Sequence, residues 1–150
     1  MNHPNQRKSI RLAIESRLEN VFLIGLAIKA FCSDAPFTEV EAYEIELAVV
    51  EAVNNAIKHA YESQPGHTVE LNVTIQTDRI SFEICDTGKK LKSIGYAELN
   101  FDPDDLETLP ENGMGLYLIQ KIMDEISYEM ISDRNKLKMT KYFKKEKPHI

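Results

Sequence analysis

One long helical segment that is apolar around most of its circumference constrains the fold more than any other feature. Thr38 is followed three residues later by Glu41, the pairing of a capping box at a helix start, and the segment runs to about Tyr61. A helix with apolar side chains on more than one face has to be covered on more than one side. We therefore predict that this helix is buried in a layered domain. Its apolar residues include Val49, Val50, Val53, Ala56, Ile57 and Ala60.

Alternating apolar and polar residues predict the strands of a sheet. Residues 8–15 alternate in this way, which predicts a strand. Residues 69–75 and 80–84 repeat the pattern on either side of Thr77-Asp78-Arg79, which predicts an antiparallel hairpin. Two further strands are expected near residues 126–132 and 137–143.

Two further helices complete the predicted elements. Ser16 and Glu19 form a second candidate capping box, for a helix that ends near residues 33–36, because the residue before a proline avoids the helical region. Another helix is expected over residues 116–124. The resulting order is strand, helix, helix, strand, strand, irregular segment, helix, strand, strand. This order predicts an α+β fold: a two-layer sandwich with a mixed, mainly antiparallel sheet and helices on one face.

The chain length and the absence of a linker or repeat predict one domain. With 150 residues the chain can form a single compact core, and we expect one domain over residues 1–150 with its core at about 8–144. Residues 89–112 contain Pro103 and Pro110, acidic clusters and no sustained period. A stretch of this length without a pattern is typically a functional loop, and we predict a mobile lid.

Composition excludes several classes of function. The formal net charge is −6, which disfavours binding to the phosphate backbone of nucleic acid. No stretch approaches the roughly 20 apolar residues of a membrane span, and the N-terminus does not resemble a signal peptide. Cys32 and Cys85 lie among apolar residues, so we expect buried free thiols rather than a disulfide. These features predict a cytoplasmic protein.

Three short motifs hold the candidate functional residues, and each has a purely structural alternative. Glu51, Asn55 and His59 are four residues apart on the long helix and are expected to share one side, as a functional stripe, a buried hydrogen-bond network or a solvated face. Asp86-Thr87-Gly88 follows an apolar strand and suits a ligand site or a simple turn. Gly113-Met114-Gly115 begins a helix, where glycine lets backbone N–H groups approach an anion or simply starts the helix.

The order and spacing of these motifs together are more specific. Glu51-x-x-x-Asn55-x-x-x-His59, then Asp86-x-Gly88, then Phe101-Asp-Pro, then Gly113-Met-Gly-Leu-Tyr-Leu-Ile119, with Met139-Thr-Lys141 near the end, resembles the GHKL ATPases (gyrase, histidine kinases, MutL). The nearest likeness is to the small single-domain anti-sigma-factor serine/threonine kinases. The resemblance extends over roughly residues 10–141.

The resemblance implies roles for individual residues, with ATP and Mg²⁺ as cofactors. Asn55 matches the magnesium ligand and Glu51 the general base, while Asp86 matches the carboxylate that accepts a hydrogen bond from the adenine amino group. Gly88 matches the glycine against which the base lies, and His59 completes the helix motif. The loop and helix start after the lid match the phosphate-binding segment, which here is Gly113, Met114, Gly115 and Leu116.

Two positions depart from the superfamily pattern. Lys90 stands where the second glycine of Asp-x-Gly-x-Gly is found, as is common in the anti-sigma-factor kinases. The Gly-Thr-Thr before the last strand is replaced by Arg134-Asn-Lys-Leu137. A threonine contact to the nucleotide is therefore expected to be missing or replaced.

The resemblance implies an ATP-dependent protein serine kinase that binds a sigma factor and phosphorylates a STAS-domain antagonist protein in a partner-switching pathway. The alternatives are a nucleotide-gated binding module with little catalysis, which controls another output, and a slow ATPase without a protein acceptor. An intact Glu51 favours the kinase, because binding alone needs no base.

The helix over residues 16–33 carries more apolar residues than one buried face requires. We therefore predict a homodimer that uses this helix, in agreement with the resemblance. The alternative is that the helix is internal, sandwiched between the sheet and the helix that begins at Thr38.

Overall fold

The computed structural model describes residues 7–90 and 114–144. Apart from Lys89 and Lys90, the predicted lid over residues 89–112 lies outside this part of the chain. The elements, in chain order, are β1 (Lys8–Glu15), the 3₁₀ turn η1 (Leu18–Asn20), α1 (Val21–Ser33), α2 (Glu39–Asn55), the π-helical turn η2 (Ala56–Ala60), β2 (Thr68–Ile75), β3 (Arg79–Asp86), α4 (Met114–Ile122), β4 (Glu125–Ile131) and β5 (Arg134–Tyr142).

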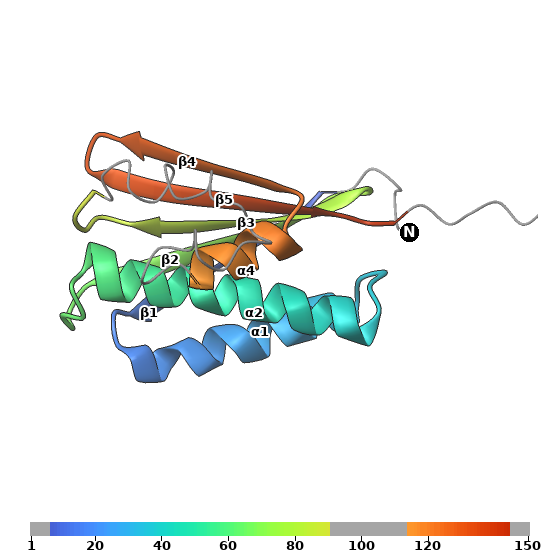
Figure 1. The fold of residues 1–150 in the computed structure, drawn as a ribbon, viewed down its shortest axis with the longest axis horizontal. Coiled ribbons are helices and arrows are strands. Elements are labelled where there is room, and N and C mark those ends of the chain that lie inside the picture. The colour runs from blue at the N-terminus through green and yellow to red at the C-terminus, as the bar shows by residue number, and fades with distance from the viewer. Residues whose placement is uncertain (1–6, 91–113, 145–150) are drawn as a thin grey trace, which may run out of the picture.

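The described strands form one five-stranded sheet in the order β1-β2-β3-β5-β4, and each described pairing is antiparallel. The predicted hairpin is present as β2 and β3, with Leu71 opposite Ile84. Figure 1 shows α1, α2 and α4 on the same side of this sheet. The α+β prediction is confirmed, as is the predicted order of helices and strands among the described residues, where the sheet is antiparallel throughout.

Helix α2 is buried because it packs against both neighbouring helices as well as the sheet. It contacts α1 on one side and α4 on the other (Figure 1). The predicted capping box is present: the Glu41 N–H donates to Thr38 Oγ1 at 3.1 Å, and the Thr38 N–H donates to Glu41 Oε1 at 3.0 Å. The backbone bond from Thr38 lowers the pKa of the Glu41 carboxyl. The fully buried side of α2 consists of Ile45, Ala48, Val49, Ala52 and Val53.

The predicted capping box at Ser16 is wrong. Ser16 is buried, and its hydroxyl donates to the Gln64 carbonyl at 2.6 Å and accepts from the His67 N–H at 3.1 Å. The hydroxyl is therefore used to join the end of β1 to the turn before β2. Helix α1 begins five residues later, at Val21, after the short turn η1. Its predicted end is confirmed at Ser33.

One side of α1 is apolar and exposed. Val21, Ile24 and Ile28 face the core, whereas Phe22 and Leu26 are 63% and 59% exposed. The alternative in which this helix is fully sandwiched is therefore wrong for these side chains.

The two cysteines are buried free thiols as predicted, and burial raises the pKa of Cys32 to about 11. Among the described helices, none has the length and apolar character needed to cross a membrane.

Candidate functional site

Glu51 and Asn55 lie together where the start of α4 meets α2. Both side chains are half-buried, one helical turn apart near the C-terminal end of α2. Gly115, the second residue of α4, lies directly against them: a methyl group placed on Gly115 would be 2.8 Å from Glu51 Oε2 and 3.3 Å from Asn55 Nδ2. The first and third sequence motifs, separated by about 60 residues in the chain, are therefore brought into contact, and glycine is what permits this close approach.

The arrangement places a carboxylate and an amide at the N-terminal end of a nine-residue helix. The free N–H groups and the dipole of such an end favour an anion such as a phosphate group. Met114 begins α4 and Leu116 is half-buried within it, whereas Gly113 lies outside the described residues. The binding roles predicted for these three residues stay predictions.

His59 differs from the other two residues of its motif. The helix changes from α to π geometry at Ala56, so that the Tyr61 N–H donates to the Ala56 carbonyl at 3.1 Å, five residues back. The wider turn changes the direction in which residue 59 points relative to Asn55, and His59 is exposed. Its predicted role in nucleotide binding stays a prediction, whereas Glu51 and Asn55 share one side as expected.

Asp86 ends β3 as predicted, with its carboxylate buried under two hydrogen bonds. Asp86 Oδ1 accepts from the Asn135 amide at 2.7 Å and from the Gly88 N–H at 3.0 Å. Burial raises the pKa of Asp86 above its ordinary value, and the two hydrogen bonds partly oppose this effect. A buried carboxylate held in one orientation is suited to accept a hydrogen bond from an amino group.

Gly88 connects the Asp86 turn to the π-helical turn η2. A methyl group on Gly88 would lie 2.4 Å from the Ala60 carbonyl oxygen, and this same oxygen accepts from the Lys89 N–H at 2.7 Å. Because η2 continues directly from Asn55, the Asp86 turn and the Glu51–Asn55 pair are attached to the same helix. The structure thus joins all three motifs through α2 and η2.

Two residues that support the Asp86 turn were missed from the sequence. The buried Tyr61 accepts from the Thr87 N–H at 2.9 Å and donates to the Thr68 carbonyl at 2.6 Å. The buried Asn135, opposite Asp86 in the β3–β5 pairing, holds the carboxylate. The sequence did hold a signal for Asn135. Arg134-Asn-Lys-Leu137 replaces the Gly-Thr-Thr of the superfamily, so a residue of this segment was a candidate to replace the threonine contact.

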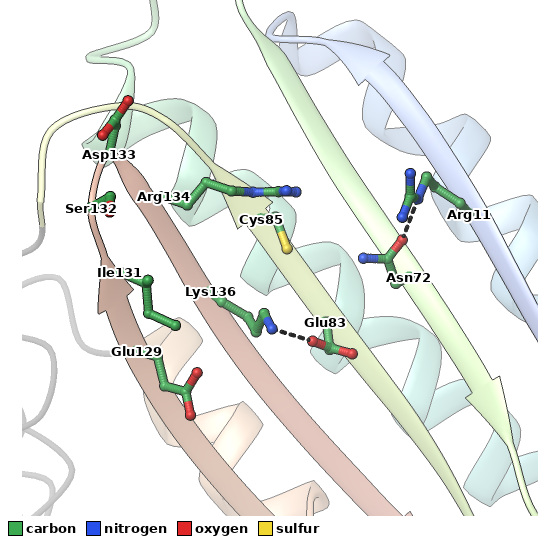
Figure 2. A pocket seen from close by; sticks show the side chains of 10 residues that line it. All are labelled: Arg11, Asn72, Glu83, Cys85, Glu129, Ile131, Ser132, Asp133, Arg134 and Lys136. Atoms are coloured by element: carbon green, nitrogen blue, oxygen red, sulfur yellow. Dashed lines mark hydrogen bonds and ion pairs between the residues drawn. The ribbon is translucent and has the colours of Figure 1, made fainter.

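A different hollow, of about 560 Å³, lies on the face of the sheet opposite the helices (Figure 2). Its cations already have partners: Lys136 pairs with Glu83 at 3.0 Å, and Arg134 pairs with Glu70. Arg11 donates to Asn72 at 3.2 Å, as Figure 2 also shows. Because Arg11, Arg134 and Lys136 are all paired within the protein, this hollow offers, among its described lining residues, no unpaired cation to an anionic ligand such as a phosphate group.

Within residues 7–90 and 114–144, no cluster of three or more His, Cys, Asp or Glu side chains could hold a metal ion. This finding excludes a metal cage built from protein side chains in the described part of the chain. It is compatible with magnesium, which typically takes one or two protein ligands and completes its shell with phosphates and water. Asn55, beside the start of α4, suits such a single ligand.

Comparisons with known proteins agree with this geometry. A family model described as "Histidine kinase-like ATPase domain" matches residues 14–141. The chain is 33% identical over 144 residues to "Serine-protein kinase RsbW" of Staphylococcus aureus (strain MSSA476), covering 91% of this chain and 88% of that protein. It is 30% identical over 145 residues to the protein of the same name in Bacillus mycoides (strain KBAB4), covering 93% and 88%.

A solved structure supports the same fold. The structure titled "The crystal structure of SiaB-SiaC complex from Pseudomonas aeruginosa" has a chain that is similar with a TM-score of 0.68, covering 86% of this chain and 88% of that one. Its sequence identity is only 14%, so the likeness concerns the fold alone. With the family model and the serine-protein kinases, the findings confirm the resemblance stated from the motifs: the chain belongs to the histidine kinase-like ATPase family, in its small serine-protein kinase branch.

Proposed function

We propose that the protein is an ATP-dependent protein serine kinase that acts as an anti-sigma factor and phosphorylates a STAS-domain antagonist protein. The observation that carries this proposal is the contact of Gly115 with Glu51 and Asn55. This contact brings a carboxylate, an amide and a helix N-terminus together, which supports their proposed roles as base, magnesium ligand and phosphate-binding end. The kinase names of the relatives at 30% and 33% identity support the same reaction class.

In the proposed reaction, Glu51 takes the proton from the serine hydroxyl of the partner protein. The serine oxygen forms a bond to the γ-phosphorus of ATP, the bond from that phosphorus to its bridging oxygen breaks, and ADP leaves. Asn55 would hold a magnesium ion, which would neutralise phosphate charge. The N-terminal end of α4 faces the phosphates, and Asp86 accepts a hydrogen bond from the adenine amino group.

Glu51 has a different role from Asn55 and Asp86 because its side chain has a different chemistry. Glu51 is a base and is not required for nucleotide affinity, whereas Asn55 and Asp86 contribute to binding. An in-line phosphoryl transfer needs positioning and charge neutralisation more than covalent catalysis, and a rigid helix such as α2 provides fixed positions for both Glu51 and Asn55.

The direct test combines partner capture with one matched pair of variants. The chain is used to recover proteins from its source cell in the presence of ATP or ADP, and a recovered STAS-domain protein is then incubated with the chain, ATP and Mg²⁺. Mass spectrometry locates phosphoserine. We expect Glu51→Gln to bind ATP but to lose transfer by about 10²–10⁴-fold. Glu46→Gln is the control, because Glu46 is half-buried on the same helix but faces Gly25 of α1.

The outcome separates the kinase from a binding module. A partner that is captured in a nucleotide-dependent way but never phosphorylated by the wild-type chain would contradict the kinase and support a nucleotide-gated switch. Equal transfer rates for Glu51→Gln and the wild type would contradict the role of Glu51. Recovery of a sigma factor in the same experiment supports the anti-sigma function, and its absence with a phosphorylated STAS partner would favour another output.

A further inference from the structure

The amide nitrogen of Asn135 holds the Asp86 turn. Asn135 lies near the start of β5 directly opposite Asp86 of β3, and it is 1% exposed. Its Nδ2 atom donates to Asp86 Oδ1 at 2.7 Å and to the Gly88 carbonyl at 3.2 Å. Both protons of the amide nitrogen are therefore used to fix the two ends of the Asp86-Thr87-Gly88 turn.

These contacts determine which way the amide group points. If the oxygen and nitrogen of Asn135 were exchanged, the amide oxygen would face a carboxylate oxygen and a carbonyl oxygen, and neither of these can donate a hydrogen bond. The nitrogen must therefore face Asp86 and Gly88. Asn135 Oδ1 is left buried, and it has no hydrogen-bond partner among the residues that the structure describes.

A buried acceptor without a donor is uncommon and calls for an explanation. Here it lies in the same amide group that holds the Asp86 carboxylate, so this corner of the site presents acceptors and needs donors. The exocyclic amino group of adenine carries two N–H donors. Hypoxanthine has a keto oxygen in its place, which can only accept.

We propose that Asn135 is a specificity-determining residue of the nucleotide site, which positions the Asp86 carboxylate and adds Oδ1 as a second acceptor for the amino group of adenine. This inference rests on the proposed ATP-binding function. It assigns the contact that the missing threonine leaves open to a residue of this chain. Selectivity for an amino purine over a keto purine depends, on this proposal, on the pair Asp86 and Asn135 and not on Asp86 alone.

The test compares the affinities for ATP and inosine triphosphate, whose base has a keto oxygen in place of the amino group and a proton on the adjacent ring nitrogen N1. Calorimetry with Mg²⁺ present gives the ratio of the two dissociation constants. We expect the wild type to favour ATP by at least about tenfold, and Asn135→Ala to lose most of this preference. Thr140→Val is the control: Thr140 is a buried polar residue of the same strand that contacts Ser81 instead, and its variant should keep the ratio.

A second variant keeps the test decisive if Asn135→Ala does not fold, which thermal unfolding would reveal. Asn135→Thr retains a residue suited to a strand, and its single hydroxyl proton cannot bond both Asp86 and Gly88. We expect an intermediate ratio. An unchanged ratio in the folded variants, an equal loss of affinity for both nucleotides, or a wild type without preference would each overturn the inference. A wild-type chain that binds neither nucleotide would instead refute the proposed function and the inference with it.

Discussion

Gly115→Ala is the substitution that best separates the geometry of the site from the stability of the fold. The new methyl group would lie 2.8 Å from Glu51 Oε2, where ordinary contacts begin at 3.4 Å, so the carboxylate or the start of α4 has to move by roughly 0.6 Å. A misplacement of up to 1 Å at a reacting group costs about 10- to 100-fold in rate. We expect this loss in phosphoryl transfer, although no chemical group is removed.

The free energy of unfolding of the variant should change little, because a small gain in helix propensity is set against a small cost of relieving the new contact. Alanine is favoured over glycine in a helix by at most about 1 kcal/mol, and the contact with a flexible Glu51 side chain can be relieved at low cost. For 150 residues, 1 kcal/mol corresponds to about 3 °C in Tm. The expected result is a Tm within about 3 °C of the wild type together with a large loss of transfer.

Gly25→Ala is the matched control. Gly25 is also helical, and its added methyl group would also meet a glutamate oxygen, Glu46 Oε1 at 3.1 Å, but between α1 and α2 and away from the site. Transfer to the STAS partner, ATP binding by calorimetry and thermal unfolding are measured for both variants. If Gly115→Ala transfers phosphate at the wild-type rate, or if Gly25→Ala loses as much activity, the contact of Gly115 with Glu51 has no special role.

Three further predictions concern Asp86, Asn55 and the exposed side of α1. Asp86→Asn should weaken ATP binding yet stabilise the fold: the raised pKa of Asp86 means that burial penalises the ionised form, so the gain over the wild type should widen as pH rises through that pKa. If thermal unfolding shows that the stability gain of Asp86→Asn shrinks as the pH rises, burial does not penalise the ionised form of Asp86. Asn55→Ala should lose magnesium-dependent ATP affinity as well as turnover, whereas magnesium-independent binding persists; equal affinity with and without Mg²⁺ in the wild type would contradict the ligand role. Phe22→Ser with Leu26→Ser should convert a dimer to a 17.2 kDa monomer in sedimentation, whereas Val40→Ser, at an equally exposed apolar residue of α2, should not; a wild type that is monomeric at micromolar concentration would refute the dimer.

Most of the fold could be predicted because its local patterns agree with its tertiary packing. The strands at residues 8–15, 69–75 and 80–84 alternate cleanly because the sheet has one covered and one open face. The capping box at Thr38 formed as predicted because the partner of its hydroxyl is local, the N–H of Glu41 three residues later. At Ser16 the same signal failed, since the hydroxyl is used by Gln64 and His67, which are about 50 residues away in the chain. A local pattern carries no information about such a distant partner.

The site was predictable in its parts but not in its connections. Glu51, Asn55 and Asp86 were identified from spacing, and the structure places the first two against Gly115. The π-helical turn at Ala56–Ala60 was not predictable, because the helix ends with this turn and no later helical residues reveal the shift in the apolar pattern. It displaces His59 from the expected stripe and presents the Ala60 carbonyl to Lys89.

The departures from regular structure gather in one place, and this pattern supports a ligand site there. The π-helical turn η2, the Asp86 carboxyl with its raised pKa and the buried acceptor of Asn135 belong to three elements that meet around Gly88. Each is unfavourable on its own for an isolated fold, since a regular helix, a neutral side chain or a paired amide would be more stable. A bound purine that donates hydrogen bonds to this corner would offset the last two costs. On the proposed function, the residues that destabilise the unliganded protein contribute to nucleotide binding, and stabilising substitutions there should lower the affinity for ATP.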